Sequence, residues 1–495
     1  MDIKRAKQEI ENSIEAYLVK NEFGEYQIPT IRQRPILLMG PPGIGKTQIM
    51  EQIAKECRIG LVAYTITHHT RQSAVGLPFI KEKVYGGKTY SVTEYTMSEI
   101  IASVYEKIEQ TGIKEGILFI DEINCVSETL APTMLQFLQA KTFGNQKIPE
   151  GWIIVAAGNP PEYNKSVRDF DVVTLDRIKK IDVEESLTVW KEYAYKEGIH
   201  PAVISYLELR KENFYRMENT VDGMLFVTAR GWEDLSELLL VYEGLNKTAD
   251  REVIGQYIQH RRIAKDFANY LELYYKYEKD YGIEDILNGK WDTGTLQKMK
   301  AASFDEHLSI VSLLNGKLSE LFKECYMTDG FVSKLYEYLL YYKENQATLM
   351  VDDICHLAQK NLEDQKNAEI LTKQDEIILK KVILALERFA MHIKGEMFVE
   401  GGAFEEVKVL FEEETKKQDD ETARAAEILQ NAFDFMEGAF GESQEMVAFI
   451  TELNANYYAI WFIKENGSDQ YYRYNKGLLF DNRQQAIVKE MERIF

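Results

Sequence analysis

The feature that most constrains this chain is a glycine-rich stretch of eight residues, Gly40-Pro41-Pro42-Gly43-Ile44-Gly45-Lys46-Thr47. It fits the pattern G-x-x-x-x-G-K-[ST] at every fixed position. The apolar run 36–39 before it predicts a buried parallel strand, and residues 47–56 after it predict a helix with one apolar face. A strand, a glycine loop and a helix N-terminus form an anion site, because the backbone N–H groups and the helix dipole both favour negative charge. The sequence therefore predicts a nucleoside-triphosphate site here.

The last two residues of this loop have separate expected tasks. Lys46 is expected to reach the β- and γ-phosphates, and the Thr47 hydroxyl is expected to hold Mg²⁺. The loop alone does not distinguish ATP from GTP, because the two nucleotides present the same phosphates.

Length and charge limit the classes of protein to consider. A chain of 495 residues has room for two or three domains and a large core. Its net charge of −21 disfavours broad nucleic-acid binding, because an acidic surface repels phosphate backbones.

Other sequence features address location. The sequence has no run of about 18 apolar residues, so we expect no membrane span. The N-terminus is charged and amphipathic, unlike a signal peptide. The four cysteines form no CxxC pair, which favours reduced thiols in a cytoplasmic protein.

The prolines divide the chain into two parts. All ten lie between Pro29 and Pro201. Because proline is excluded from helix interiors, the first part is expected to be loop-rich α/β and the rest mostly helical. Strands alternating with helices in the first part predict a parallel, doubly wound sheet. The expected strands are 36–39, 61–66, 117–120, 153–157 and 178–183, and the expected helices are 47–56, 97–110 and about 132–140.

Three further segments have local signals. Residues 77–97 predict a β-hairpin around Gly86-Gly87, with a surface loop as the alternative. Residues 411–424 are charge-rich and indicate a solvated helix face or a linker. A short hairpin around Asn466-Gly467 is a weaker alternative within the helical part.

An acidic pair follows one of the expected strands. Four apolar residues, 117–120, lead directly into Asp121 and Glu122. Carboxylates at the C-terminal tip of a parallel strand lie where such sheets bind ligands. Asp121 is expected to complete the Mg²⁺ shell, and Glu122 to orient or deprotonate an attacking water. The alternative is a solvated turn.

Polar and basic residues elsewhere suit a phosphate site. Asn159 follows the strand 153–157 and is placed to touch a γ-phosphate, although asparagine before proline is also common in turns. Arg177 precedes the last strand and is a candidate to reach a neighbouring subunit's phosphate, with Arg168 as the competing candidate. Arg230 starts a helical run and is a candidate to reach a phosphate from a lid. A surface salt bridge or a solvated cap is the alternative for these arginines.

Taken together, these segments resemble the AAA+ ATPases, and most of all their MoxR branch within the dynein-related group. RQSAVGLP at 71–78 and a hairpin insert also resemble that branch, and the resemblance covers about residues 30–245. The segments that carry it are GPPGIGKT at 40–47, ILFIDEIN at 117–124, AAGNP at 156–160, LDRI at 175–178 and TARGWEDL at 228–235.

The resemblance implies a role for each matching residue. Lys46 and Thr47 become the Walker A pair, and Asp121 and Glu122 the Walker B pair. Asn159 becomes sensor 1. Arg177 becomes the arginine finger that acts in trans, and Arg230 becomes sensor 2.

The resemblance also implies an activity and a domain plan. It implies a Mg²⁺-dependent ATPase in hexameric rings that remodels or activates a protein client, often beside a von Willebrand A domain protein. The expected divisions are an N-terminal helix or linker at 1–29, an AAA+ α/β domain at 30–184, a helical lid at 185–245 and helical accessory domains at 246–495.

Two other functions stay open on the sequence. One is a nucleic-acid-linked AAA+ motor. It is supported by three lysines of the expected hairpin, Lys81, Lys83 and Lys88. The other is a nucleotide-gated scaffold whose helical extension binds a partner. The sequence does not name the client.

Overall fold

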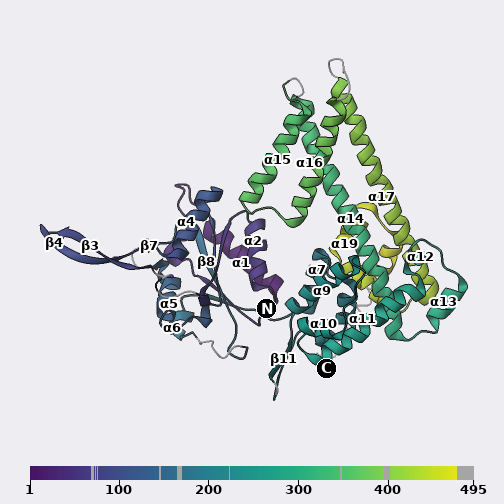
Figure 1. Cartoon of the computed structure of the whole chain (residues 1–495), viewed down its shortest axis with the longest axis horizontal. Coiled ribbons are helices and arrows are strands. Elements are labelled where there is room, and N and C mark those ends of the chain that lie inside the picture. Colours follow the sequence, from purple (N-terminus) through teal and green to yellow (C-terminus); the bar gives the residue numbers. More distant parts are fainter. Residues whose placement is uncertain are drawn as a thin grey trace, which may run out of the picture. The chain divides into compact units, whose positions relative to one another are not determined.

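A computed structural model of the chain, shown in Figure 1, consists of two compact units. The first is Met1–Ser186 together with Lys360–Glu376, and the second comprises the described residues of Leu187–Gln359 and Ile377–Phe495. The structure describes residues 1–68, 72, 74, 76–143, 146–163, 170–221, 223–345, 348–394 and 402–476.

A parallel sheet of five strands forms the centre of the first unit. Its spatial order is β2-β5-β8-β1-β9, and every neighbouring pair is parallel. All five expected strands are present within a residue or two of their predicted ends. Their bounds are Ile36–Met39 for β1, Gly60–Thr65 for β2, Gly116–Asp121 for β5, Trp152–Gly158 for β8 and Lys179–Asp182 for β9.

The middle of this sheet is apolar because helices cover it. Every residue of β8 is buried, and β5 is buried except at its last residue. At one end of the sheet the indole of Trp152 lies over two glycines, and a Cβ on Gly116 would lie 2.7 Å from its ring. A side chain at Gly116 would therefore displace the indole.

The helices expected in the first part are also present. They are α2 at Lys46–Glu56, α4 at Glu99–Thr111 and α5 at Ala131–Ala140, joined by α1 at Ile3–Leu18 and the short α6 at Val172–Leu175. Helix α1 packs on α2, where Lys7 Nζ lies 2.6 Å from Glu56 Oε1. The segment Lys360–Glu376 groups with this unit, and Glu369 Oε2 lies 2.6 Å from Lys107 Nζ on α4.

Two hairpins also belong to this unit. β3, Pro78–Tyr85, pairs with β4, Lys88–Tyr95, and the hairpin extends away from the sheet (Figure 1). The predicted hairpin is confirmed, and both turn glycines have the positive φ that such a tight turn requires. A second, shorter hairpin, β6 at Thr142–Phe143 with β7 at Gln146–Lys147, was not expected from the sequence.

The second unit is mostly helical, as expected. Its helices are α7 (Leu187–Glu197), α8 (Pro201–Leu209), α9 (Ala229–Gly244), α10 (Arg251–Tyr257), α11 (Arg261–Tyr281), α12 (Ile283–Leu287), α13 (Thr293–Lys300), α14 (Phe304–Asn345), α17 (Gly402–Phe440), α18 (Gln444–Ala455) and α19 (Tyr457–Asn466). Two more helices, α15 (Val351–Asn367) and α16 (Lys373–Lys394), belong to it only in part, because the segment Lys360–Glu376 groups with the first unit. In the part of the whole chain that the structure describes, no helix combines the length and the apolar character that a membrane span requires.

Three details of the second unit differ from or refine the sequence predictions. An antiparallel hairpin, β10 at Arg216–Thr220 and β11 at Gly223–Val227, interrupts the helices and was missed. Residues 411–424 lie inside α17, so the helix alternative was right. The hairpin around Asn466-Gly467 was wrong, because α19 runs to Asn466 and Gly467 caps its C-terminus with φ of 78°.

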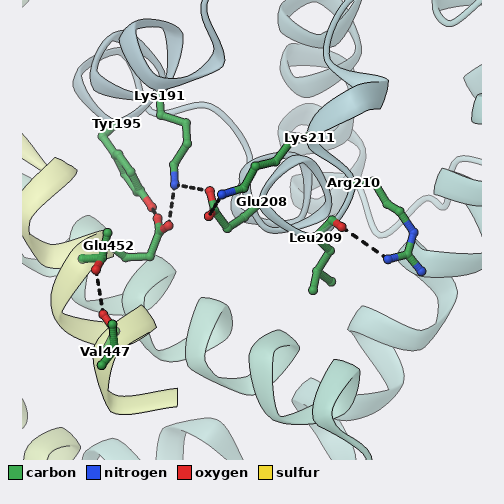
Figure 2. A network of polar contacts seen from close by, with 9 residues as sticks. Lys191, Tyr195, Glu208, Leu209, Arg210, Lys211, Val447 and Glu452 are labelled. Atoms are coloured by element: carbon green, nitrogen blue, oxygen red, sulfur yellow. Dashed lines mark hydrogen bonds and ion pairs between the residues drawn. The ribbon is translucent and has the colours of Figure 1, made fainter. Parts of the chain in front are cut away.

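A buried ionic network ties together α7, α8 and α18 of the second unit (Figure 2). Lys191 Nζ lies 2.7 Å from Glu208 Oε2 and also donates to Glu452. The other carboxylate oxygen of Glu452 accepts a hydrogen bond from the Tyr195 hydroxyl. Burial lowers the pKa of Lys191, but the two carboxylates outweigh burial and raise it overall. Likewise, burial raises the pKa of Glu208, but its lysine partners outweigh this and lower it. The network therefore stabilises the charged forms of these groups.

Candidate nucleotide-binding site

The sequence-predicted site residues of the first unit follow three neighbouring strands. In the sheet β8 lies between β5 and β1, so the C-terminal tips of these three strands are adjacent. The glycine loop follows β1, the acidic pair closes β5, and Asn159 follows β8. This is the edge at which parallel α/β sheets bind ligands.

The loop has the backbone that a phosphate cradle needs. Gly43 and Gly45 have φ of 74° and 91°, a region that other residues rarely adopt. A Cβ on Gly40 would lie 2.6 Å from the carbonyl oxygen of Val183. Helix α2 begins at Lys46, within the end of the loop, so its first backbone N–H groups are available to an anion.

Lys46 lies inside the loop, with 8 % of its surface exposed. Its ammonium donates to the carbonyl oxygens of Gly40 and Pro41, at 2.8 and 2.7 Å. It also donates to Oδ1 of Asn159, at 2.9 Å. The structure thus brings together two residues that are 113 positions apart and that the sequence assigned separately to phosphate contact.

Thr47 and Asp121 also meet. The Thr47 hydroxyl donates to Oδ2 of Asp121 at 2.9 Å. A hydroxyl and a carboxylate oxygen are the hard donors that Mg²⁺ prefers, and this ion usually takes only one or two protein ligands beside phosphates and water. The two residues therefore fit a Mg²⁺ ion bound with a nucleotide.

Glu122 has an unusual backbone. Its φ and ψ are 56° and 34°, in the left-handed region, and its N–H donates to Oδ1 of Asp121 at 2.9 Å. Residues other than glycine rarely hold this conformation, and they do so most often at functional sites. The turn ends the β5 strand at once and presents the Glu122 side chain at the strand tip, where it is partly exposed.

One residue of this region was missed by the sequence analysis. Asn124 is 2 % exposed. Its side-chain amide donates to the carbonyl oxygen of Asn159 and accepts from the backbone N–H of Asn159. It lies in the stretch ILFIDEIN, but asparagine near a turn is too common for the sequence to mark it.

The three arginines are placed differently. Arg177 is exposed and donates to Oε1 of Gln139 on α5 at 2.5 Å, so it lies on the surface of the first unit. Arg168 lies outside the described residues. Arg230 belongs to the second unit, exposed in the first turn of α9, where the Thr228 side chain accepts from Gly231 N at 3.2 Å.

The comparison with protein families agrees with this geometry. A family model described as "ATPase family associated with various cellular activities (AAA)" matches residues 36–175. This span runs from β1 to the end of α6 and holds the loop, the acidic pair and Asn159. Residues 36–175 are an AAA ATPase domain. Binding and hydrolysis of ATP are the activity of such a domain, and AAA proteins typically assemble into rings. No curated protein matches the chain.

The rest of the chain lies outside the matched span. Arg177 comes two residues after the AAA domain's last matched residue, and Arg230 is far beyond it. The matched span thus contains Lys46, Thr47, Asp121, Glu122 and Asn159, and it contains neither of the two arginines.

Proposed function

We propose that this protein is a MoxR-like AAA+ motor that couples Mg²⁺-dependent ATP hydrolysis to remodelling of a partner protein. The observation that carries the proposal is the convergence of Lys46, Thr47, Asp121 and Asn159 at one edge of the AAA sheet. Phosphate contact, metal contact and sensing require these groups at one place.

Each residue has a proposed task in hydrolysis. The loop 40–45 wraps the phosphates with the backbone N–H groups of its residues other than proline, and Lys46 binds the β- and γ-phosphates. Thr47 and Asp121 hold Mg²⁺, which neutralises phosphate charge when bound.

The remaining AAA residues act on the γ-phosphate. Glu122 accepts a proton from the attacking water, whose oxygen forms a bond to the γ-phosphorus as the bond to the β-γ bridging oxygen breaks. The products are ADP and phosphate. Asn159 contacts the γ-phosphate or this water and already lies 2.9 Å from the Lys46 ammonium.

We assign the two arginines to contacts made on assembly and closure. An exposed guanidinium such as that of Arg177 suits a finger that enters the site of a neighbouring copy and stabilises developing charge. The MoxR resemblance supports a ring of six and assigns Arg230 to sensor 2. It also makes a von Willebrand A domain protein one candidate partner.

A protein client is favoured over nucleic acid by the hairpin β3–β4. Lys81 and Lys83 both contact Glu94 across the hairpin, so this carboxylate offsets one of their two charges. Together with the net charge of −21, this leaves a poor surface for a phosphate backbone. Binding of DNA or RNA that weakens steeply with added salt would restore the nucleic-acid alternative.

The experiment that tests the proposal is ATP turnover per subunit, with Mg²⁺, over a range of protein concentrations. Wild type is compared with Glu122→Gln as the blank and with Arg177→Ala. We expect turnover that rises with concentration, a dead blank, and an Arg177→Ala variant that stays low at every concentration. No turnover above the blank would overturn hydrolysis and favour the nucleotide-gated scaffold.

The binding site itself is tested by Lys46→Ala. Loss of charge-assisted contacts to two phosphates is expected to lower nucleotide affinity by roughly 10- to 100-fold. Unchanged affinity for a fluorescent ATP analogue would refute the assignment of the loop.

A further inference from the structure

Asn124 bridges two strand tips of the AAA domain at the point where their hydrogen bonding stops. The ladder between β5 and β8 ends at the pair Ile120 and Ala156. Beyond it, Asn124 Nδ2 donates to the carbonyl oxygen of Asn159 at 2.7 Å, and Asn124 Oδ1 accepts from Asn159 N at 3.3 Å.

This pairing follows from the chemistry of the side chain. A carboxamide carries one carbonyl and N–H donors, as a peptide unit does, so it can pair with both backbone groups of one residue. Asn124 therefore extends the β5–β8 pairing past the end of β5, although the backbone of β5 has already turned away at Glu122.

The surroundings leave room for this contact and fix it. A Cβ on Gly158 would lie 2.6 Å from Asn124 Oδ1, so a glycine is needed beside the amide. Asn124 itself lies in a short 3-10 helix, Ile123–Cys125, whose last N–H donates to the carbonyl of Glu122 at 2.8 Å. The buried amide thus belongs to the same short turn as Glu122.

On its other side, Asn159 faces the glycine loop. Its Oδ1 accepts from Lys46, and the preceding carbonyl, that of Gly158, accepts from Gly40 N at 3.3 Å. The order of contacts therefore runs from the Glu122 turn through Asn124 and Asn159 to the lysine that meets phosphate.

We propose that Asn124 is a positioning residue for ATP hydrolysis. It holds the backbone of Asn159, so that the carboxamide of Asn159 stays aligned with Lys46 and the γ-phosphate. The inference rests on the proposed function, because it gives Asn124 a task in turnover. Asn124 touches neither nucleotide nor water in this role and acts through Asn159.

A double-mutant cycle tests this route. Asn124→Ala is expected to lower kcat by about 10- to 100-fold, because a displacement of about 1 Å in a catalytic group has effects of that size. KM for ATP should change by less than about threefold, since ground-state phosphate contacts remain. In the Asn159→Ala background, Asn124→Ala should lower kcat by less than about twofold further, because its effect passes through the missing side chain.

Two further variants control for folding. Gly158→Ala keeps both asparagines but pushes the Asn124 amide, so it should reproduce the fall in kcat even if Asn124→Ala folds poorly. Asn315→Ala removes another buried asparagine, 4 % exposed and in the second unit, and should leave kcat unchanged. A loss of kcat that simply multiplies in the double mutant would overturn the proposal.

Amide hydrogen exchange gives a second readout that needs no turnover. With full-length protein and no nucleotide, exchange at the Asn159 N–H should speed up in Asn124→Ala and in Gly158→Ala, but not in Asn315→Ala. Unchanged exchange would overturn the bridge, whatever the kinetics show. If wild type has no turnover above Glu122→Gln, hydrolysis fails as the function, and this exchange result still decides whether Asn124 holds Asn159.

Discussion

Two of the buried lysines, one in each unit, donate hydrogen bonds to acceptors of different kinds. Lys46 donates to three neutral oxygens at the strand tips of the AAA domain. Lys191 bonds two carboxylates between helices of the second unit. Carbonyl and amide oxygens satisfy the N–H groups of a lysine without cancelling its charge, whereas carboxylates do both. These hydrogen bonds of Lys46 therefore leave the ammonium charged at the edge of the sheet where an anion is proposed to bind, while those of Lys191 join helices.

If this contrast is correct, changes near Lys46 should alter chemistry and leave folding almost intact. The largest such effect is expected for Glu122→Gln, which removes the proposed base but keeps the shape of the side chain. Phosphate release should fall by at least about 100-fold, within the usual contribution of a general base. Binding of a fluorescent ATP analogue and the urea midpoint should stay near wild type. Retention of more than a tenth of wild-type turnover would argue against Glu122 as the base.

Changes near Lys191 should have the reverse effect. Lys191→Met leaves two carboxylates without their shared cation, and breaking a buried pair in this way costs about 3 kcal/mol of unfolding free energy. Urea unfolding followed by circular dichroism measures the loss. The matched control is Lys211→Met, which removes the exposed partner 2.8 Å from Glu208 and should cost less than about 1 kcal/mol. Equal losses in the two variants would contradict a structural role for burial here.

The same network predicts a pH dependence with a definite sign. The pKa of Glu208 is lowered from its ordinary 4.5, so its contribution is complete above that value and is lost as pH falls through the folded pKa. The pKa of Lys191 is raised from 10.5, so its contribution is complete below that value and is lost at higher pH. The stability difference between wild type and Lys191→Met should therefore be largest between these values and shrink on both sides. A difference that stays constant down to pH 3 would rule this out.

The smallest expected effect concerns a single hydroxyl. Tyr195→Phe removes the second hydrogen bond to Glu452 but keeps the ring and the ion pair. A hydrogen bond to a charged group contributes about 1.5 kcal/mol, so the urea midpoint should drop measurably but less than in Lys191→Met. Tyr457→Phe serves as control, since Tyr457 is 46 % exposed at the start of α19. A drop as large in the control would point to a general effect of losing a tyrosine hydroxyl.

The sequence predicted the AAA sheet well because its signals are local. Each buried strand is a short apolar run, and the glycines and acids that follow it mark where the strand ends. The order of the strands was not predicted, and it is the observed order β5-β8-β1 that brings Lys46 and Asn159 to the same edge.

Contacts between distant residues were beyond the same reasoning. Lys191 and Glu452 are 261 positions apart, and nothing in either helix marks its residue as a partner of the other. Asn124 was missed for a related reason, since its role depends on the space beside Gly158 on another strand.

The missed and mistaken hairpins differ in kind. The hairpin β10–β11 did have a local signal, the Asp222-Gly223 dipeptide between alternating residues, but the absence of proline favoured helices there. For Asn466-Gly467 the same type of dipeptide marks a helix end, because a glycine with positive φ is also a common C-cap.

The indole packed over glycine at the end of the AAA sheet also has a spectroscopic consequence. Of the five tryptophans, Trp152 is the one in the first unit, and the other four, at 190, 232, 291 and 461, belong to the second. Its emission therefore reports on the AAA sheet, and the protein with Trp152→Phe emits from the helical unit alone. Subtracting the two signals during unfolding separates the melting of the sheet from that of the helices.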